Sequence, residues 1–177
     1  MENTTTNNTQ VTPASVGVRY GLIVGVISVI ISFALMSTHN DQGPLKWLSF
    51  AVLVGGIFMA HNYFKQHNGG FMRYGQGLSI GTILSGITGL LGGIFTYIYV
   101  SFIDNTYLAR TVEASRAKLE EGGKLTEEQI DQAMSMSQSM MTGPMMLVMA
   151  LIGSLIGGFV ISLIISAITK RTRPEFE

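Results

Sequence analysis

Apolar residues gather in four long segments, each close to the roughly 20 residues that a helix needs to cross a bilayer core. The segments run from about Tyr20 to Met36, Trp47 to Phe64, Tyr74 to Ile103 and Met145 to Ile168. Short polar stretches rich in turn-forming residues separate the first three segments. The pattern therefore predicts an all-α membrane protein with four transmembrane helices. The third segment is long enough to tilt strongly or to project beyond the bilayer as a helix.

Small residues recur every fourth position in three of these segments. The third segment carries the longest series, which we name the small-residue ladder: Gly77, Gly81, Ser85, Gly89 and Gly93. The first segment begins with Gly17, Gly21 and Gly25, and the fourth carries Ser154, Gly158, Ser162 and Ser166. Small residues let helix backbones approach closely in lipid, so the pattern favours packing within one four-helix bundle. Two alternatives stay open: a Gly/Ser face that binds a second copy or a partner helix, and a helix that unwinds around a substrate.

The one long polar segment, from Asp104 to Gly143, predicts a helical hairpin between the third and fourth spans. Its first helix is expected from about Thr106 to Glu121, with Arg116 and Glu120 paired at i, i+4, and Gly122-Gly123 ends it. The second helix is expected to start at Thr126, because Gln129 stands three residues later in the spacing of a capping box.

The distribution of positive charge predicts the orientation of the spans. An even number of spans places both termini on one side, with the basic residues Arg19, Lys65, Arg73, Lys170, Arg171 and Arg173. The other side holds Lys46, Arg110, Arg116, Lys118 and Lys124, together with most of the acids. Because the first set lies next to span ends, the positive-inside rule places both termini in the cytoplasm.

These patterns divide the chain into five parts. They are a disordered polar tail at 1–16, the first three transmembrane helices at 17–104, an extracytoplasmic helical hairpin at 105–143, the fourth transmembrane helix at 144–169 and a cytoplasmic tail at 170–177.

Composition agrees with the membrane assignment and excludes several kinds of partner. The chain has 47% apolar residues, 12% charged residues and zero formal net charge, which is unusual for a soluble domain. No basic stripe with interleaved aromatic residues is present, so we expect the lipid bilayer as a partner and no nucleic acid. The absence of cysteine excludes disulfides and thiolate metal sites.

No set of residues in the sequence predicts catalysis. The three histidines, His39, His61 and His67, do not form a zinc-binding helix motif, and no nucleophile elbow or phosphate loop is present. We therefore expect no enzyme activity, no cofactor, and no catalytic, cofactor-binding or metal-binding residues.

Four polar residues, Arg19, His61, Asn62 and Gln76, fall near the predicted cytoplasmic face. They either share one polar pocket or lie separately at the interface, and interfacial placement is the simpler interpretation.

The methionines form the most distinctive chemical cluster. Seven of the eleven lie close together: Met134, Met136, Met140, Met141, Met145, Met146 and Met149. Thioethers are soft ligands that suit Cu(I), so a copper-binding membrane protein is a remote alternative. Methionine is also a flexible gap-filler, and packing of the hairpin onto the bundle explains the cluster more simply.

Three motifs make the chain resemble a bacterial family of four-span membrane proteins, domain of unknown function 4199, known mainly from Bacteroidetes. They are the opening Tyr20-Gly21-Leu22-Ile23-x-Gly25, the junction from Tyr63 to Gly77, and the ending Leu163-Ile164-Ile165-Ser166-Ala167-Ile168 with Lys170-Arg171 and Pro174. The resemblance implies a bacterial inner-membrane location. It supplies no catalytic or binding residues.

Taken together, the patterns predict a structural or interaction protein of the membrane, a scaffold or accessory subunit that uses small-residue helix packing. The partners considered are another membrane protein or a second copy, bound through Gly/Ser helix faces. The alternative from another class is a small transporter or channel component.

Overall fold

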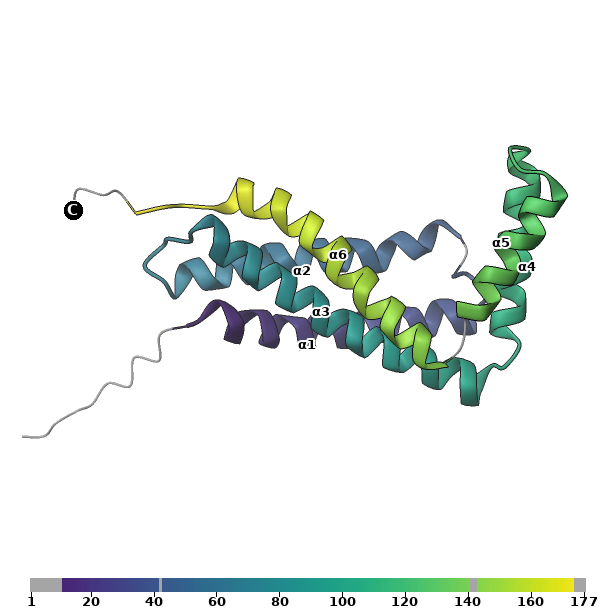
Figure 1. Ribbon diagram of the computed structural model, residues 1–177. Coiled ribbons are helices and arrows are strands. Elements are labelled where there is room, and N and C mark those ends of the chain that lie inside the picture. Colours follow the sequence, from purple (N-terminus) through teal and green to yellow (C-terminus); the bar gives the residue numbers. More distant parts are fainter. Residues whose placement is uncertain (1–10, 42, 141–142, 174–177) are drawn as a thin grey trace, which may run out of the picture.

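The computed structural model describes residues 11–41, 43–140 and 143–173, which are almost entirely helical (Figure 1). The α-helices are α1 (Pro13–Ser37), α2 (Trp47–Gln66), α3 (Tyr74–Ile98), α4 (Tyr107–Gly122), α5 (Glu127–Met140) and α6 (Gly143–Thr169). A 3₁₀ turn, η1 (Pro44–Lys46), precedes α2, and a π-helical turn, η2 (Tyr99–Ile103), extends α3. The all-α fold with a helical hairpin between the third and fourth long helices is as predicted.

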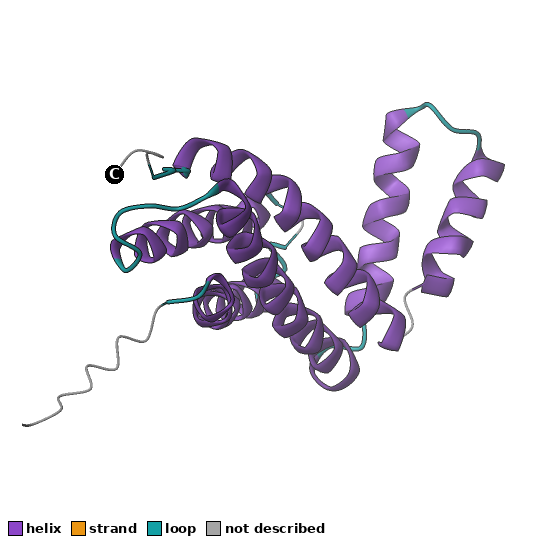
Figure 2. Cartoon of the chain, turned by 60° about the vertical axis from the view of Figure 1, so that its left-hand side comes forward, coloured by secondary structure: helices purple, strands orange, loops and turns teal. Residues whose placement is uncertain are grey.

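The long helices α1, α2, α3 and α6 form one elongated bundle with two distinct ends (Figure 1). At one end, which we call the termini end, α1 begins, the α2–α3 loop turns and α6 finishes. At the other, the hairpin end, α1 joins α2 and the α4–α5 hairpin stands at an angle to the bundle, as Figure 2 also shows. The hairpin is therefore set apart from the helices that could cross a membrane.

Helix α1 begins about two turns before the predicted start of the first span. Thr12 caps it: the Thr12 hydroxyl accepts from the amide of Ser15 at 3.1 Å, and the Ser15 hydroxyl accepts from the amide of Thr12 at 3.2 Å. Pro13 fits the first turn because its missing amide proton has no helical partner there. This capping box extends the helix into the polar segment. The first ten residues of the predicted tail lie outside the described residues.

Four helices of the described chain are long and apolar enough to cross a bilayer: Pro13–Ser37, Pro44–Gln66, Tyr74–Ile103 and Pro144–Thr169. Large apolar side chains cover their outer surfaces, with Phe102 79% exposed and Ile168 74% exposed. Such surfaces suit hydrocarbon and would be unfavourable in water. By helix length and composition this is a multi-pass membrane protein in contact with a lipid bilayer.

The small-residue ladder of α3 packs against α6 in one antiparallel register. A Cβ atom added at Gly77 would lie 2.7 Å from Ser166 Oγ, and one added at Gly81 or Gly89 would overlap with the hydroxyl of Ser162 or Ser154. At the middle position of the ladder the serine is on α3 and the glycine is on α6, so Ser85 fills the space beside Gly158. Gly93 completes the series opposite Ala150, at 3.2 Å between the added Cβ and the Ala150 Cβ. Each step thus pairs a small residue of one helix with a small residue of the other.

Helix α1 packs on the opposite face of α3, again through small residues. A Cβ atom added at Gly17 would lie 3.0 Å from the carbonyl oxygen of Ile80, and one at Gly21 would lie 3.0 Å from that of Leu84. Backbone of one helix thus meets backbone of the next, which only glycine permits at this distance. Helix α3 is the central helix, and the predicted packing within one bundle is confirmed.

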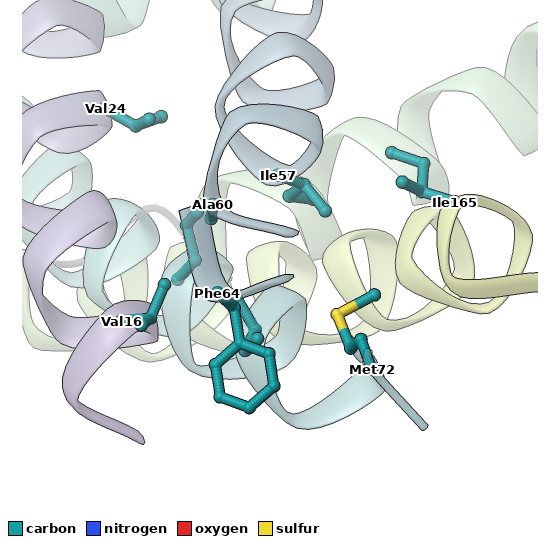
Figure 3. Close-up of a cluster of buried hydrophobic side chains, with 9 residues drawn as sticks. Val16, Val24, Ile57, Ala60, Phe64, Met72 and Ile165 are labelled. Atoms are coloured by element: carbon teal, nitrogen blue, oxygen red, sulfur yellow. The ribbon is translucent and has the colours of Figure 1, made fainter. Parts of the chain in front are cut away.

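A cluster of buried apolar side chains fills the termini end of the bundle (Figure 3). Phe64 and Ile57 of α2 and Val16 of α1 are almost completely buried there, and Met72 joins them from the α2–α3 loop. Full burial of side chains of this size contributes about 1.5–3 kcal/mol each in water. Here the cluster fixes how α1, α2 and α6 meet around the start of α3.

The hairpin has the two helices and the caps that the sequence predicts. The amide of Thr126 donates to Gln129 Oε1 at 3.0 Å and the amide of Gln129 donates to the Thr126 hydroxyl at 3.4 Å, which completes the capping box. Gly123 ends α4 with a positive φ of 60°, the conformation that favours glycine. The Arg116 guanidinium binds Glu120 of its own helix and Asp131 of α5, at 2.8 Å in each case, so it links the two helices.

Candidate functional site

The imidazole of His61, on α2, is fully buried and reaches α3 and α6. Its Nε2 lies 2.9 Å from the carbonyl oxygen of Gly77, and its Nδ1 lies 2.8 Å from the Thr169 hydroxyl. Because a carbonyl oxygen only accepts, Nε2 carries a proton and donates it to Gly77. The Thr169 hydroxyl has one proton, which it donates either to Nδ1 or to the carbonyl oxygen of Ile165, 2.7 Å away. One side chain thus joins three of the four long helices.

Thr169 is a partner that the sequence reading missed. It lies at the end of α6 and continues the face that carries Ser162 and Ser166, so the spacing offered an indication of its inward position. The hydroxyls of Ser85, Ser162 and Ser166 are fully buried on the same interface and have no hydrogen-bond partner within the described part of the chain. They act there as small residues that fit against glycine.

The pocket considered for Arg19, His61, Asn62 and Gln76 is not formed, because each side chain has a different environment. Arg19 donates to the Tyr63 hydroxyl at 2.8 Å, and its guanidinium also lies 4.9 Å from the centre of that ring. Gln76 accepts from the amide of Arg73 at 2.8 Å and so caps α3. Asn62 lines a small groove beside Lys65. Local partners therefore hold Arg19 and Gln76, and of the four side chains only that of His61 is fully buried.

The α2–α3 loop is joined to the segment that follows α6. Met72 and Arg171 exchange two backbone hydrogen bonds of 2.8 Å each, an isolated antiparallel bridge. The loop reaches this position through Gly69 and Gly70, whose φ values of 65° and 85° favour glycine. The bridge fixes the backbone on both sides of a groove of about 790 Å³, whose wall includes Phe71, Arg73 and Arg171.

At the hairpin end, titratable side chains meet where α4 leaves the π-helical turn. Asp104 accepts from the Thr106 hydroxyl at 2.6 Å and from the Thr106 amide at 3.0 Å, and it also pairs with Arg110. The Thr106 hydroxyl bond, more than the nearby Arg110 charge, holds the pKa of Asp104 below its ordinary value. Burial raises the pKa of the Tyr107 hydroxyl.

Tyr107 and Arg110 border a groove of about 340 Å³ at the base of the hairpin, together with His39 and Asp41. Arg110 also lies 2.6 Å from His39 Nδ1, so the α1–α2 connection and α4 are held together there. The ion pair of Asp104 with Arg110 anchors the first turn of α4 to a residue that precedes the helix. Within the described ranges no group of three histidine or acidic side chains is placed to hold a metal ion.

The methionine cluster is divided between burial and exposure. Met134 is buried beneath the hairpin, whereas Met136, Met140, Met145 and Met149 are exposed. Met141 lies outside the described residues. The exposed methionines are thus divided between the surface of α5 and that of α6, and Cu(I) binding stays a prediction.

Comparison with known proteins agrees with the resemblance drawn from the motifs. No similar curated protein and no similar solved structure was found. A family model described as "Protein of unknown function (DUF4199)" matches residues 19–171, which take in most of α1, the other three long helices, the hairpin and the Met72–Arg171 bridge. The chain therefore belongs to the DUF4199 family of proteins of unknown function.

Proposed function

We propose that the protein is a non-catalytic membrane scaffold, whose four-helix bundle holds the α4–α5 hairpin at one face of the membrane. The observation that carries this proposal is the use of the small-residue ladder inside the bundle. All five ladder positions lie against α6, four of them against side chains and Ser85 against Gly158. The ladder therefore serves helix packing and does not line an open polar path.

The hairpin is the part of the molecule that is free to bind another protein. Helix α4 has no fully buried residue, and α5 buries only Ile130 and Met134 among its described residues. Leu108, Val112 and Arg116 border a shallow groove of about 480 Å³ between the two helices. An exposed groove with mixed apolar and charged walls suits a protein surface better than a small solute.

The charge distribution supports an orientation with both termini in the cytoplasm, and the family resemblance implies a bacterial inner-membrane location. The six basic residues Arg19, Lys65, Arg73, Lys170, Arg171 and Arg173 belong to the termini end of the bundle. Basic residues next to span ends favour the cytoplasmic side. The hairpin would then lie outside the cytoplasm.

Cysteine accessibility distinguishes a scaffold from a transporter. The chain has no cysteine, so Ser85→Cys and Ser162→Cys each place a single thiol in the α3–α6 interface. We expect both thiols to resist a water-soluble maleimide in native membranes, whereas Ser135→Cys on the exposed surface of α5 reacts. Denaturation should then expose all three thiols. Reaction of the Ser85→Cys or Ser162→Cys thiol as fast as that of Ser135→Cys would indicate a water-filled path and favour transport.

The same reagent reports the orientation in intact cells. If both termini are cytoplasmic, we expect the maleimide to label the Ser135→Cys thiol from outside the inner membrane. The Lys170→Cys thiol should be labelled only after the membrane is opened. The reverse pattern would overturn the orientation.

A further inference from the structure

The termini end carries a groove whose walls contain three arginines and no acid. The groove has a volume of about 790 Å³ and lies between the α2–α3 loop and the chain after α6. Arg73, Arg171 and Arg173 line it, together with Phe71 and Gln76. In the described part of the chain every acidic residue falls between Asp41 and Asp131, in the elements of the hairpin end. The positive charge of this groove is therefore not neutralised by described side chains around it.

Two of the guanidinium groups, those of Arg171 and Arg173, are held by an aromatic contact that uses none of their N–H donors. Arg171 and Arg173 lie 5.8 Å and 5.4 Å from the centre of the Phe71 ring, so the same ring supports both. Stacking on an aromatic face orients a guanidinium without using its N–H donors. The Met72–Arg171 bridge fixes the backbone from which Arg171 extends. The site is thus preorganised, which lowers the entropic cost of binding.

The chemistry of the lining selects one class of ligand. Arginine presents donors in a planar fork that matches the oxygens of phosphate, and several arginines around one space suit a group with more than one anionic oxygen. The first turn of α3 also borders the groove and adds the partial positive charge of a helix N-terminus. A second, smaller groove with Lys65 in its wall adjoins the other side of Arg171.

We propose that the groove formed by Phe71, Arg73, Arg171 and Arg173 binds a phosphate group. Two sources present this group at the end of a membrane bundle: the headgroup of an anionic phospholipid and a phosphate-bearing solute. The headgroup and the solute would each accept hydrogen bonds from the same arginine side chains.

The test measures binding to the purified full-length chain in detergent with two probes. One arm titrates inorganic phosphate, and the other adds phosphatidylglycerol, with phosphatidylcholine as the lipid comparison. Native mass spectrometry counts retained lipid, and thermal unfolding follows stabilisation by either probe. Binding of inorganic phosphate would identify a phosphate-bearing solute as the source of the phosphate group. Selective retention of phosphatidylglycerol over phosphatidylcholine, without phosphate binding, identifies the lipid headgroup.

Variants locate the binding. Arg171→Gln combined with Arg173→Gln should lower the affinity for the probe at least about tenfold, because charge-assisted hydrogen bonds are lost. Lys170→Gln removes the same type of charge from the neighbouring position outside the groove wall, and it should change affinity by less than about twofold, since screened surface charge contributes little. If the double variant does not fold, Arg73→Gln alone must weaken binding. Absence of binding with both probes, or an equal loss in Lys170→Gln, would overturn the proposal.

Discussion

His61 shows how a single polar residue is made compatible with a helix bundle in lipid. Its ring is fully buried, yet both nitrogens have partners, the Gly77 carbonyl on α3 and the Thr169 hydroxyl on α6. A buried polar group without such partners is costly, and more so where no water can replace them. The imidazole can therefore be buried in the bundle, because α3 supplies an acceptor and α6 a hydroxyl within hydrogen-bond distance.

Replacement of Thr169 tests this arrangement. We expect Thr169→Val to lower the free energy of unfolding by about 1–3 kcal/mol, because it keeps the side-chain volume and leaves His61 Nδ1 without a partner. Thr82→Val is the matched control, since the Thr82 hydroxyl bonds only to Leu78 of its own helix. Unfolding in detergent micelles measures both variants. A Thr169→Val protein as stable as the Thr82→Val protein would show that the His61 contact contributes nothing.

At the scale of the element, α3 is shaped by the two helices that pack on it. The ladder faces α6, where serine fits against glycine, and Ile80, Leu84 and their neighbours face the glycines of α1. Such packing gains stability from close contact and not from the hydrophobic effect, because lipid is as apolar as the helices. One added methyl group at a ladder position therefore has a larger effect than the same change on the lipid-facing side.

An exchange of small residues tests the register of α3 and α6. We expect Gly81→Ala to destabilise the bundle by about 1–3 kcal/mol, since its Cβ would overlap with the Ser162 hydroxyl. Adding Ser162→Gly should restore much of that loss, although Ser162→Gly alone weakens the packing. A double-mutant cycle in micelles measures the coupling. Gly153→Ala is the control, because nothing lies within 4 Å of its added Cβ. Additive effects of the two changes would contradict the pairing.

The elements were predictable because their causes are local and periodic. Four apolar segments, the ladder spacing and the Thr126 capping box all appear in consecutive residues, so the helices and the hairpin could be derived from them. The contacts between distant segments could not. No local pattern pairs His61 with Thr169 or Met72 with Arg171, since those contacts depend on how the helices are placed in space. The early start of α1 was missed because Thr12 and Ser15 stand in a polar segment.

On the scale of the whole molecule, the bundle separates two different surfaces. The termini end combines a compact apolar cluster with a basic groove, and the hairpin end presents two exposed helices linked by the ion pair of Arg116 with Asp131. Between them, the small residues of three helices are used for internal packing. We therefore assign binding to the two ends of the bundle and helix packing to its middle.

The most direct test of internal packing is a cysteine pair across the ladder. A Cβ at Gly93 lies 3.2 Å from the Cβ of Ala150, close to the separation in natural disulfides. In a chain without other cysteines, Gly93→Cys with Ala150→Cys should form a disulfide within one chain when an oxidant is added, give a monomeric band on a non-reducing gel and lose the mass of two hydrogen atoms. Gly92→Cys with Ala150→Cys is the control and should stay reduced. A disulfide-linked dimer, or equal oxidation of the control, would contradict the account.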